Sequence, residues 1–342
     1  MNILFIGTKK SHDKYLSNSY LQYSALKKLY KNIDSIDTSK ILFLPSITRK
    51  IFIHISPFIF EHFINYQILT RTKKKYDLIW VKGGDFIGKK LILELKKITK
   101  KIVFICNDNP FVKRDKQRWR LFLSAAKYYD CIIFQDPSRI IPSKKLGVKK
   151  SMIVLPPYDQ KTHKKHNISI AEKKRYQNDI IFIGTWSPKK GEFIKKIIEL
   201  GININVYGLR WDKDPNYESL KSKIKLKHIH NPKYSKLIQS SKIALCLFAE
   251  ENLDTITARS IEIPAIGTLL CSKRTKAMKN IFIEDKEAIF FSTPKECAKK
   301  INYYLKNQNK AKDIARRGHI KITKILNPSH ENLIQKVINN IY

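Results

Sequence analysis

The sequence predicts an α/β protein made of two successive βα domains. Its 342 residues exceed the usual size of a single hydrophobic core. Short apolar runs alternate with amphipathic helical patterns in both halves, which is typical of strands and helices that follow one another. Hydrophobic residues make up 43% of the chain and aromatic residues 11%, enough for two cores, so the 28% of charged residues does not indicate disorder.

The first domain is expected at residues 1–156. Its opening run is apolar and ends in Gly7, and a polar loop and a helical pattern follow. The same order returns at Asp77 to Asp85, where a strand ends in paired glycines. The expected elements are a strand at Asn2 to Gly7, a helix from about Leu16 to Tyr30, the strand DLIWVK, a helix at Ile87 to Ile98, the strand KIVFIC, a helix near Asp115 to Tyr128, the strand DCIIF, a short helix that reaches Gly147, and a strand at Ser151 to Leu155.

The second domain is expected at residues 179–325, after a polar and basic linker at residues 157–178. Pro156 and Pro157 mark the boundary, because proline has no amide donor and restricts the residue before it. A last amphipathic pattern in residues 326–342 is compatible with a helix that packs back on the first domain. The elements expected in the second domain are the strand DIIFIG, a helix at Lys189 to Leu200, the strand INVYG, a weaker strand around Ile224 to Ile229, a short helix, the strand IALCLF, and helices at Pro294 to Leu305 and Ala311 to Ile325.

The formal net charge of +38 fits attraction to nucleic acid, to anionic lipid or to phosphorylated substrates. Most of the excess is lysine scattered over predicted helix faces, which is typical of solvated surfaces. No nucleic-acid-binding motif accompanies the charge, so we do not expect a nucleic-acid partner. The basic surface is compatible with peripheral contact with the anionic inner face of a membrane.

Cysteine usage and the amino terminus indicate a cytoplasmic protein. The five cysteines lie far apart and mostly inside apolar runs, as reduced core residues do. The first residues read as a strand and lack the features of a signal peptide. The longest oily region, Ile41 to Leu69, is interrupted by charged residues and by Pro57, which excludes a simple spanning helix. We interpret this region as core packing, with contact to a membrane surface as the alternative.

The stretch from Asp254 to Leu270 has the pattern of an anion and hydroxyl clamp at a helix start. Arg259 offers a planar donor fork suited to phosphate, and Thr257 and Ser260 are candidate helix caps. Glu262 lies three residues after Arg259, hence on a similar helix face, where a carboxylate accepts hydrogen bonds from two hydroxyl groups. A plain surface ion pair between Arg259 and Glu262 is an equally good interpretation of the two residues alone.

A second candidate anion site follows the strand DIIFIG. Gly184 and Thr185 come directly after the strand, and Lys190 lies at the start of the helix that follows. Free amides at a helix start favour an anion, and a nearby lysine adds a point charge. When this loop is considered alone, an ordinary turn between a strand and a helix is the favoured interpretation.

Candidate general bases occur in loops of the first domain. Asp108 lies in the loop NDNP after a strand, and His12 lies in the loop after the opening strand. A turn-forming role for Asp108 and an exposed position for His12 are the alternatives, and a turn role is also expected for Asp85. The chain contains no GxSxG elbow, Walker loop or full GxGxxG, so hydrolase, ATPase and dehydrogenase functions lack support.

Together, these motifs resemble the CgeB-like glycosyltransferases, a spore-maturation-protein-like group within the GT-B enzymes that use nucleotide sugars. The resemblance covers about two-thirds of the chain and is densest in its second half. It is carried by the segments NDNPF, YDCIIFQDPSR, LGVKK, LPPYD, DIIFIGTWSPKKGEFI, INVYGLRW, TARSIEIPAIGTLL, EDKEAIFF and KINYYL.

The resemblance implies a GT-B fold, in which two Rossmann-like domains face a central cleft and the second domain binds most of the sugar nucleotide. By the same resemblance Glu262 binds the ribose, while Arg259, the Gly184 loop and Lys190 bind the diphosphate. Related retaining enzymes have a glutamate eight positions before the ribose residue, where this chain has Asp254. The shorter side chain leaves open whether Asp254 or Glu251 takes that role.

The resulting expectation is a cytoplasmic glycosyltransferase that transfers sugar from a UDP- or GDP-sugar to a glycan or lipid-linked acceptor of the cell envelope. Charge develops on the leaving diphosphate, and a cationic clamp with helix-start amides stabilises it. No acidic metal-binding motif stands out, so we expect no cofactor and no need for a metal ion. The alternatives are a non-enzymatic basic module that binds nucleic acid or anionic membrane, and a sugar-nucleotide epimerase on the same fold.

Overall fold

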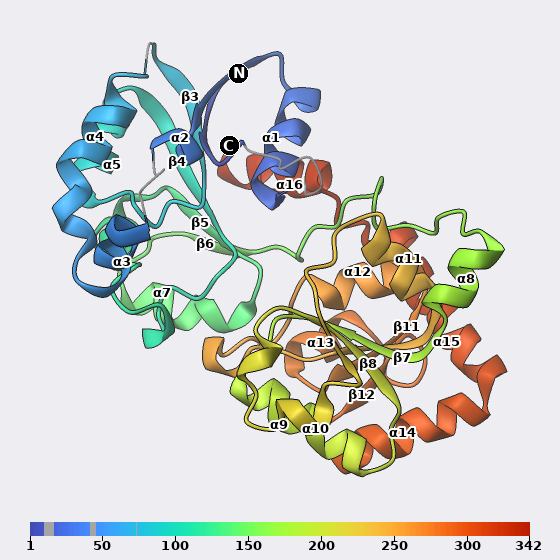
Figure 1. The fold of residues 1–342 in the computed structure, drawn as a ribbon. Helices are drawn as coiled ribbons and strands as arrows, with labels where there is room; N and C mark the ends of the chain where they lie inside the picture. Colours follow the sequence, from blue (N-terminus) through green and yellow to red (C-terminus); the bar gives the residue numbers. More distant parts are fainter. Residues whose placement is uncertain (10–16, 42–45, 73) are drawn as a thin grey trace. The chain divides into compact units, whose positions relative to one another are not determined.

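The computed structural model describes residues 1–9, 17–41, 46–72 and 74–342, and His12 lies outside these ranges. The described residues contain two six-stranded sheets in which all strands are parallel, with helices packed on them (Figure 1). The predicted α/β class is confirmed.

The chain forms two compact units. Unit 1 comprises residues 1–155, 251–253 and 330–342, and unit 2 comprises residues 156–250 and 254–329.

The sheet of unit 1 has the strand order β2-β1-β3-β4-β5-β6. Side chains alternate between its faces, so Leu4 and Ile6 join one core whereas Ile3 and Phe5 join the other. Both faces are covered, which explains why the central strands read as continuous apolar runs. The strands are β1 (Asn2–Gly7), β2 (Asn32–Asp37), β3 (Tyr76–Lys82), β4 (Thr99–Cys106), β5 (Cys131–Phe134) and β6 (Ser151–Ile153).

The last helix of the chain belongs to unit 1. α16 (His330–Ile341) buries Leu333 and Ile334 in the same core as Ile3, and Figure 1 shows it beside α1. The other helices of this unit are α1 (Asn18–Leu29), α2 (Thr38–Ile41), α3 (Ser46–His54), η1 (Pro57–Phe60), α4 (Glu61–Leu69), α5 (Lys89–Lys96), η2 (Lys113–Asp115), α6 (Arg120–Ala125), η3 (Ala126–Tyr128), η4 (Pro137–Arg139) and α7 (Ile140–Lys145).

The sheet of unit 2 has the order β12-β11-β10-β7-β8-β9. On one face, Ile180, Phe182 and Ile243 pack with residues of α9 and α14 in a single apolar core. The strands are β7 (Asn178–Ile183), β8 (Ile204–Gly208), β9 (Ile224–Leu226), β10 (Ser241–Cys246), β11 (Leu269–Lys273) and β12 (Ile289–Phe291).

The helix between β10 and β11 ends at a glycine. Gly267 adopts a φ of +96°, and its N–H donates to the carbonyls of Ile263 and Pro264, which stops the helix before β11. The helices of unit 2 are α8 (Ile170–Tyr176), α9 (Pro188–Glu199), η5 (Trp211–Lys213), α10 (Tyr217–Leu220), α11 (Lys233–Gln239), α12 (Arg259–Ile266), α13 (Lys276–Ile281), α14 (Pro294–Lys306), α15 (Gln308–Ile320) and the π-helix η7 (Lys321–Leu326). The short helix η6 (Glu250–Asn252) contains residues of both units.

The segment expected as a linker, residues 157–178, is ordered within unit 2. It contains α8, whose start is a capping box between Ser169 and Glu172. Lys236 forms an ion pair with Glu172 at 2.6 Å, and Gln239 exchanges two hydrogen bonds with the backbone of His166. These contacts fix the second half of the segment against α11.

The apolar region from Ile41 to Leu69 packs in the core only in part. Phe52, Ile64 and Ile68 are buried, as expected, but Ile59 and Phe63 lie exposed on the outside. All five cysteines are buried free thiols. Along the described ranges, no helix combines the length and apolarity needed to cross a membrane.

Candidate functional site

The strand order of the second sheet reverses between β7 and β10. The chain proceeds from β7 to β8 and β9 on one side, and β10 to β12 continue on the other side. In open parallel sheets a ligand binds outside the carboxyl ends of the strands at such a reversal. The glycine loop after Ile183 and the segment from Leu247 to α12 both leave the sheet at this edge. The topology therefore favours the two segments that the sequence patterns also selected.

Arg259 and Glu262 lie in the first turn of α12 and form an ion pair between Nη1 and Oε2. The Glu262 side chain is 9% exposed and that of Arg259 37% exposed, so the pair is partly enclosed and is not a plain surface ion pair. The predicted helix caps are wrong, because the residue at the cap position is Ala258 and no side chain bonds the first turn. The N–H groups of Ser260, Ile261 and Glu262 donate to the backbone carbonyls of Thr257 and Ala258, so the start of α12 is closed by its own backbone.

Two aromatic side chains enclose the ion pair. The guanidinium of Arg259 lies 4.4 Å from the ring centroid of Tyr234, a cation–π contact that holds the charge over the ring. On the other side, Nε2 of His163 is 3.7 Å from Oε1 of Glu262. The ring of His163 meets that of Tyr234 edge-on at 5.9 Å. These contacts bring together residues from the segment before α8, from α11 and from α12.

The hydrogen bonds of His163 determine which ring nitrogen carries the proton. The backbone N–H of Asp159 donates to Nδ1 at 3.1 Å, so Nδ1 is unprotonated. Nε2 therefore carries the proton and faces the carboxylate of Glu262. Nδ2 of Asn231 lies 3.0 Å from Nε2, and Oδ1 of Asn231 lies 2.8 Å from the hydroxyl of Ser235. A protonated Nε2 needs an acceptor, which the Asn231 amide provides when its nitrogen and oxygen are interchanged.

The surroundings keep Glu262 ionised. Burial alone raises the pKa of Glu262, but the charge of Arg259, followed by His163, outweighs burial and lowers the pKa below its ordinary value. Burial acts against the charge of Arg259, yet the neighbouring carboxylate raises the pKa of the guanidinium further. At neutral pH the site thus holds a carboxylate that only accepts hydrogen bonds beside a permanent cation.

Two histidines on the loop after β9 lie near this cluster and were missed by sequence reasoning. The rings of His228 and His230 meet edge-on at 4.1 Å. Burial, the neighbouring His230 and the charge of Arg259 all lower the pKa of His228. Their sequence signal is the run KHIHNP after a weak strand, directly before the cis peptide bond Asn231–Pro232.

The glycine loop after β7 has a compact geometry. The indole N–H of Trp211 donates to the carbonyl of Gly184 at 2.9 Å, and a Cβ at Gly184 would lie 2.8 Å from the ring of Phe182. Thr185 is exposed, and Nζ of Lys190 donates to its carbonyl at 3.4 Å. No side chain caps α9, so the N–H groups of its first turn have no side-chain acceptor on the side of this loop.

The remaining candidates around α12 differ in their access to solvent. Ser260 is completely buried, and its hydroxyl accepts a hydrogen bond from the N–H of Thr257 at 3.3 Å, so it holds the turn before α12. Asp254 is half-buried, and its backbone N–H donates to the carbonyl of Ala249 at 3.2 Å. Glu251 belongs to unit 1. One of its carboxylate oxygens is buried without a hydrogen-bond partner among the described residues.

In unit 1, Asp108 lies in the loop after β4 within a charged cluster. Nη1 of Arg118 is 3.5 Å from Oδ2 of Asp108, and Nη2 of Arg114 is 4.0 Å from Oδ1. Arg118 also donates to Asp85 at 2.7 Å. The Asp108 side chain is therefore half-exposed and lies close to two cations. The other base candidate of this domain, His12, lies outside the described residues.

A buried lysine beside Asp108 was not selected from the sequence. Lys82 ends β3, is 5% exposed, and donates through Nζ to the side-chain oxygen of Asn107. Burial lowers the pKa of Lys82 to about 8, whereas Cys106 and Asp108 act in the opposite direction. A lysine at the end of the run DLIWVK, directly before two glycines, was the available signal.

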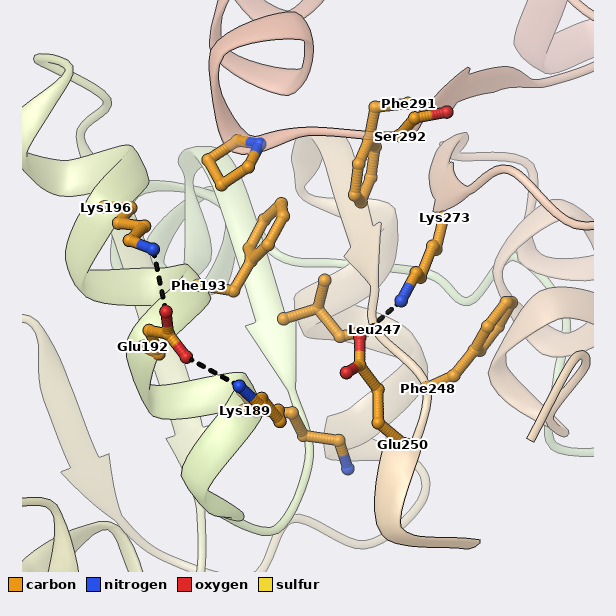
Figure 2. Close-up of a pocket in the computed structure, with 12 residues that line it drawn as sticks. Lys189, Glu192, Phe193, Lys196, Leu247, Phe248, Glu250, Lys273, Phe291 and Ser292 are labelled. Carbon is orange, nitrogen blue, oxygen red and sulfur yellow. Dashed lines mark hydrogen bonds and ion pairs between the residues drawn. The ribbon is translucent and has the colours of Figure 1, made fainter. Parts of the chain in front are cut away.

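A pocket of about 230 Å³ opens in unit 2 between α9 and the carboxyl ends of β10 to β12. Figure 2 shows Glu192 bonded to Lys189 and Lys196 on one side and Glu250 bonded to Lys273 on the other. Among the predicted donor-binding residues, Lys190 alone lines this pocket. Its apolar lining consists of Phe193, Leu247, Phe248, Phe291 and Pro294.

In the described part of the chain, no three His, Cys, Asp or Glu side chains are grouped so as to hold a metal ion. The cations of the site are side chains of the protein itself. Arg259 and Lys190 supply charge, and the start of α9 supplies N–H groups. This arrangement suits a ligand that combines phosphate groups with hydroxyl groups.

Comparisons with known proteins show which folds this chain is similar to. Residues 189–332 match the family model described as glycosyl transferase-like. No curated protein sequence matches the chain. Among solved structures, Anabaena Alr3699/HepE in complex with UDP is similar at 12% identity, with a TM-score of 0.65 over 99% of this chain and 100% of that chain. Sucrose-phosphate synthase from Thermosynechococcus elongatus is similar at 10% identity, with a TM-score of 0.71 over 100% and 99%.

A third structure is a mutant of S. aureus TarM in complex with fondaparinux, α-GlcNAc-glycerol and UDP. It shares 14% identity with this chain, with a TM-score of 0.61 over 82% of this chain and 58% of that one. At these identities the likeness concerns the fold. The chain therefore has the GT-B fold of glycosyltransferases, and its residues 189–332 match the glycosyl transferase-like family.

Proposed function

We propose that the chain is a glycosyltransferase that moves a sugar from a nucleoside-diphosphate sugar to a hydroxyl group of an acceptor. The observation that carries the proposal is the enclosed pair of Arg259 and Glu262 at the strand-order reversal of the second sheet. The family model over residues 189–332 and the likeness to HepE, which has been solved with UDP-glucose, support it.

Glu262 is assigned to the ribose. Its carboxylate, kept ionised by its neighbours, accepts hydrogen bonds from both hydroxyl groups of a ribose diol. One of its oxygens accepts a hydrogen bond from Arg259, and the remaining lone pairs of the carboxylate are available to hydroxyl groups. The Arg259 side chain is the more exposed of the two and is able to swing toward a phosphate.

The diphosphate is assigned to Arg259, Lys190 and the N–H groups at the start of α9. Negative charge builds up on the leaving diphosphate as the bond to the sugar breaks, and fixed positive groups aimed at that charge lower the barrier. Gly184 and Thr185 form the loop against which the phosphates would lie. Ser260, the remaining residue proposed for the donor side, is buried and supports the turn before α12 from inside.

The base and the acceptor are the less defined parts of the proposal. Asp108 and Asp254 are the carboxylates assigned to the sugar-transfer step, and His12 remains a candidate by sequence alone. The acceptor is a glycan or lipid-linked sugar of the cell envelope, reached from the cytoplasm. The order of motifs favours the CgeB-like group among the GT-B enzymes, with a UDP- or GDP-sugar as donor.

A thermal-shift and calorimetric titration with UDP, GDP and their sugars tests the donor site. A ligand that binds only the folded state raises the melting temperature. We expect one nucleotide to stabilise the wild type and to lose at least about tenfold in affinity in Arg259→Ala and Glu262→Ala. The matched controls replace Arg316 or Asp313 with alanine. These two residues form an exposed ion pair with the same spacing in α15. Equal affinity in all variants would show that the assigned site is wrong.

A further inference from the structure

A group of large apolar side chains is exposed on one segment of unit 1. The described residues include 20 exposed large hydrophobic side chains, and six of them fall between residues 47 and 66. The segment consists of α3, η1 and α4, and Figure 1 shows α4 at the outer edge of its unit. We call these six residues the apolar patch: Ile47, Ile55, Phe58, Ile59, Phe63 and Tyr66.

The helical part of the patch carries apolar side chains on two opposite sides, although Glu61, His62, Asn65 and Gln67 of α4 are polar. Ile64 and Ile68 point into the core and are 1% and 0% exposed. Ile59, Phe63 and Tyr66, spaced four and three residues apart, form the opposite stripe and are 62%, 48% and 61% exposed. Exposed apolar side chains that gather on one surface often mark a site of interaction. The core covers the inner side chains, whereas the outer stripe is exposed among the residues that the structure describes.

Basic side chains surround the patch. Residues 46–72 contain a single carboxylate, Glu61. The guanidinium of Arg120 lies 5.3 Å from the ring centroid of Phe58, and Nζ of Lys116 lies 2.9 Å from Nδ1 of His54. The exposed cations of this surface are Arg49, Lys50, Arg71, Lys116 and Arg120.

We propose that the apolar patch is the surface through which the protein docks on a bilayer that contains anionic lipids. Isoleucine and phenylalanine enter the boundary between head groups and acyl chains, and the tyrosine ring lies at the interface. The charged ends of the surrounding lysine and arginine side chains contact the lipid phosphates, and their apolar stems lie close to the acyl chains of the lipid. A second copy of this chain fits less well, because its own five cations would face those of the first copy. The inference rests on the surface of unit 1 alone and not on the proposed donor site.

Vesicle flotation of the full chain tests the inference. The vesicles contain phosphatidylcholine alone or phosphatidylcholine with about one third phosphatidylglycerol. The net charge of +38 attracts anionic vesicles through any face, so the decisive variant leaves the charge unchanged. This variant is Ile59→Ser with Phe63→Ser. Its control is Ile141→Ser with Ile170→Ser, which replaces two isoleucines outside the patch that are 68% and 90% exposed.

We expect the wild type and the control to float with the anionic vesicles, and the Ile59→Ser/Phe63→Ser variant to bind at least about tenfold more weakly. Arg49→Gln with Lys50→Gln should weaken binding roughly 30-fold, and more than Lys144→Gln with Lys145→Gln, which removes the same charge elsewhere. Circular dichroism and melting temperature verify that all variants are folded.

Equal binding of the two apolar variants would overturn the inference, because attraction would then depend on charge alone. Light scattering in the absence of vesicles tests whether a second copy of this chain binds the patch instead. A wild-type dimer that Ile59→Ser/Phe63→Ser converts to a monomer, without vesicle binding by the wild type, would likewise contradict the inference and identify the patch as a contact between copies. A monomeric wild type that floats only with an intact patch supports it.

Discussion

Nε2 of His163 faces Oε1 of Glu262 at 3.7 Å, although the two residues lie far apart in the sequence. The backbone N–H of Asp159 fixes the ring by bonding Nδ1, so the Nε2 proton points at the carboxylate. We infer that His163 positions Glu262 for its hydroxyl partners. His163 thus acts through Glu262 and not on the ligand directly.

Replacing His163 with phenylalanine keeps the ring and removes the proton donor. We expect His163→Phe to weaken nucleotide binding about fivefold in calorimetry, because the carboxylate loses a stabilising neighbour and a fixed orientation. His166→Phe serves as the control, since the ring of His166 bonds the carbonyl of Thr162 and not Glu262. Unchanged affinity in His163→Phe, with the fold intact, would assign His163 to packing alone.

Transfer should proceed without a divalent metal ion. Arg259, Lys190 and the N–H groups at the start of α9 supply the positive charge that a leaving diphosphate needs. We therefore expect product formation at an unchanged rate after treatment with EDTA. Loss of product under EDTA, with recovery on addition of Mg²⁺ or Mn²⁺, would contradict the expectation. A parallel assay of Lys190→Met should show slower transfer in either buffer.

The fold class was predictable because the central strands of both sheets are covered on two faces. KIVFIC and DIIFIG are continuous apolar runs for that reason, and each is followed by a loop and a helical pattern. The edge strand β2, NIDSID, was missed, because it is polar and only Ile36 in it is buried. α8 was missed although its capping box, Ser169 and Glu172, is visible in the sequence.

The candidate site was only partly readable from the sequence. Arg259 and Glu262 are three residues apart, so local helix geometry predicts that they lie on one face. His163 and Tyr234 approach them through tertiary packing, and no local pattern reports such a contact. The burial of Ser260 was equally hidden, because a serine in a first helical turn resembles a cap whether or not solvent reaches it.

A second charged network, at the end of β11, contributes to stability. Arg274 bonds both Glu284 and Glu296, and Lys300 bonds Glu284 at 2.8 Å. The bonds from Arg274 lower the pKa of Glu284 to about 2. Arg274→Gln should lower the free energy of unfolding by about 2 kcal/mol at pH 7, because two carboxylates lose a charged donor.

The pH dependence of this loss has a defined sign. Because the pKa of Glu284 is lower in the folded state, its contribution is complete above the ordinary value of 4.5 and is lost as the pH falls toward 2. Urea unfolding of the wild type and Arg274→Gln should therefore converge between pH 4.5 and about 2. Arg316→Gln, which removes an exposed ion pair with Asp313, should change stability by less than about 1 kcal/mol.

Lys82 should make the folded state less stable at neutral pH than at alkaline pH. Burial lowers its pKa from 10.5 to about 8, so the unfolded chain binds the proton more tightly than the folded one. Between these pH values stability rises with pH, and below about 8 the cost of the buried charge is fully present. Lys82→Met removes this titration while keeping an unbranched apolar side chain.

We expect Lys82→Met to be more stable than the wild type at pH 7 and to lose about 3 kcal/mol of that advantage between pH 8 and 10.5. Denaturant unfolding of both proteins across this range measures the difference, and the titration of the many other lysines cancels in it. Lys90→Met, which removes an exposed lysine of the same unit, should run parallel to the wild type. If the stability of Lys82→Met also follows that of the wild type across this pH range, burial does not lower the pKa of the Lys82 amine. The Asn107 side chain would then bond a lysine that titrates as in water.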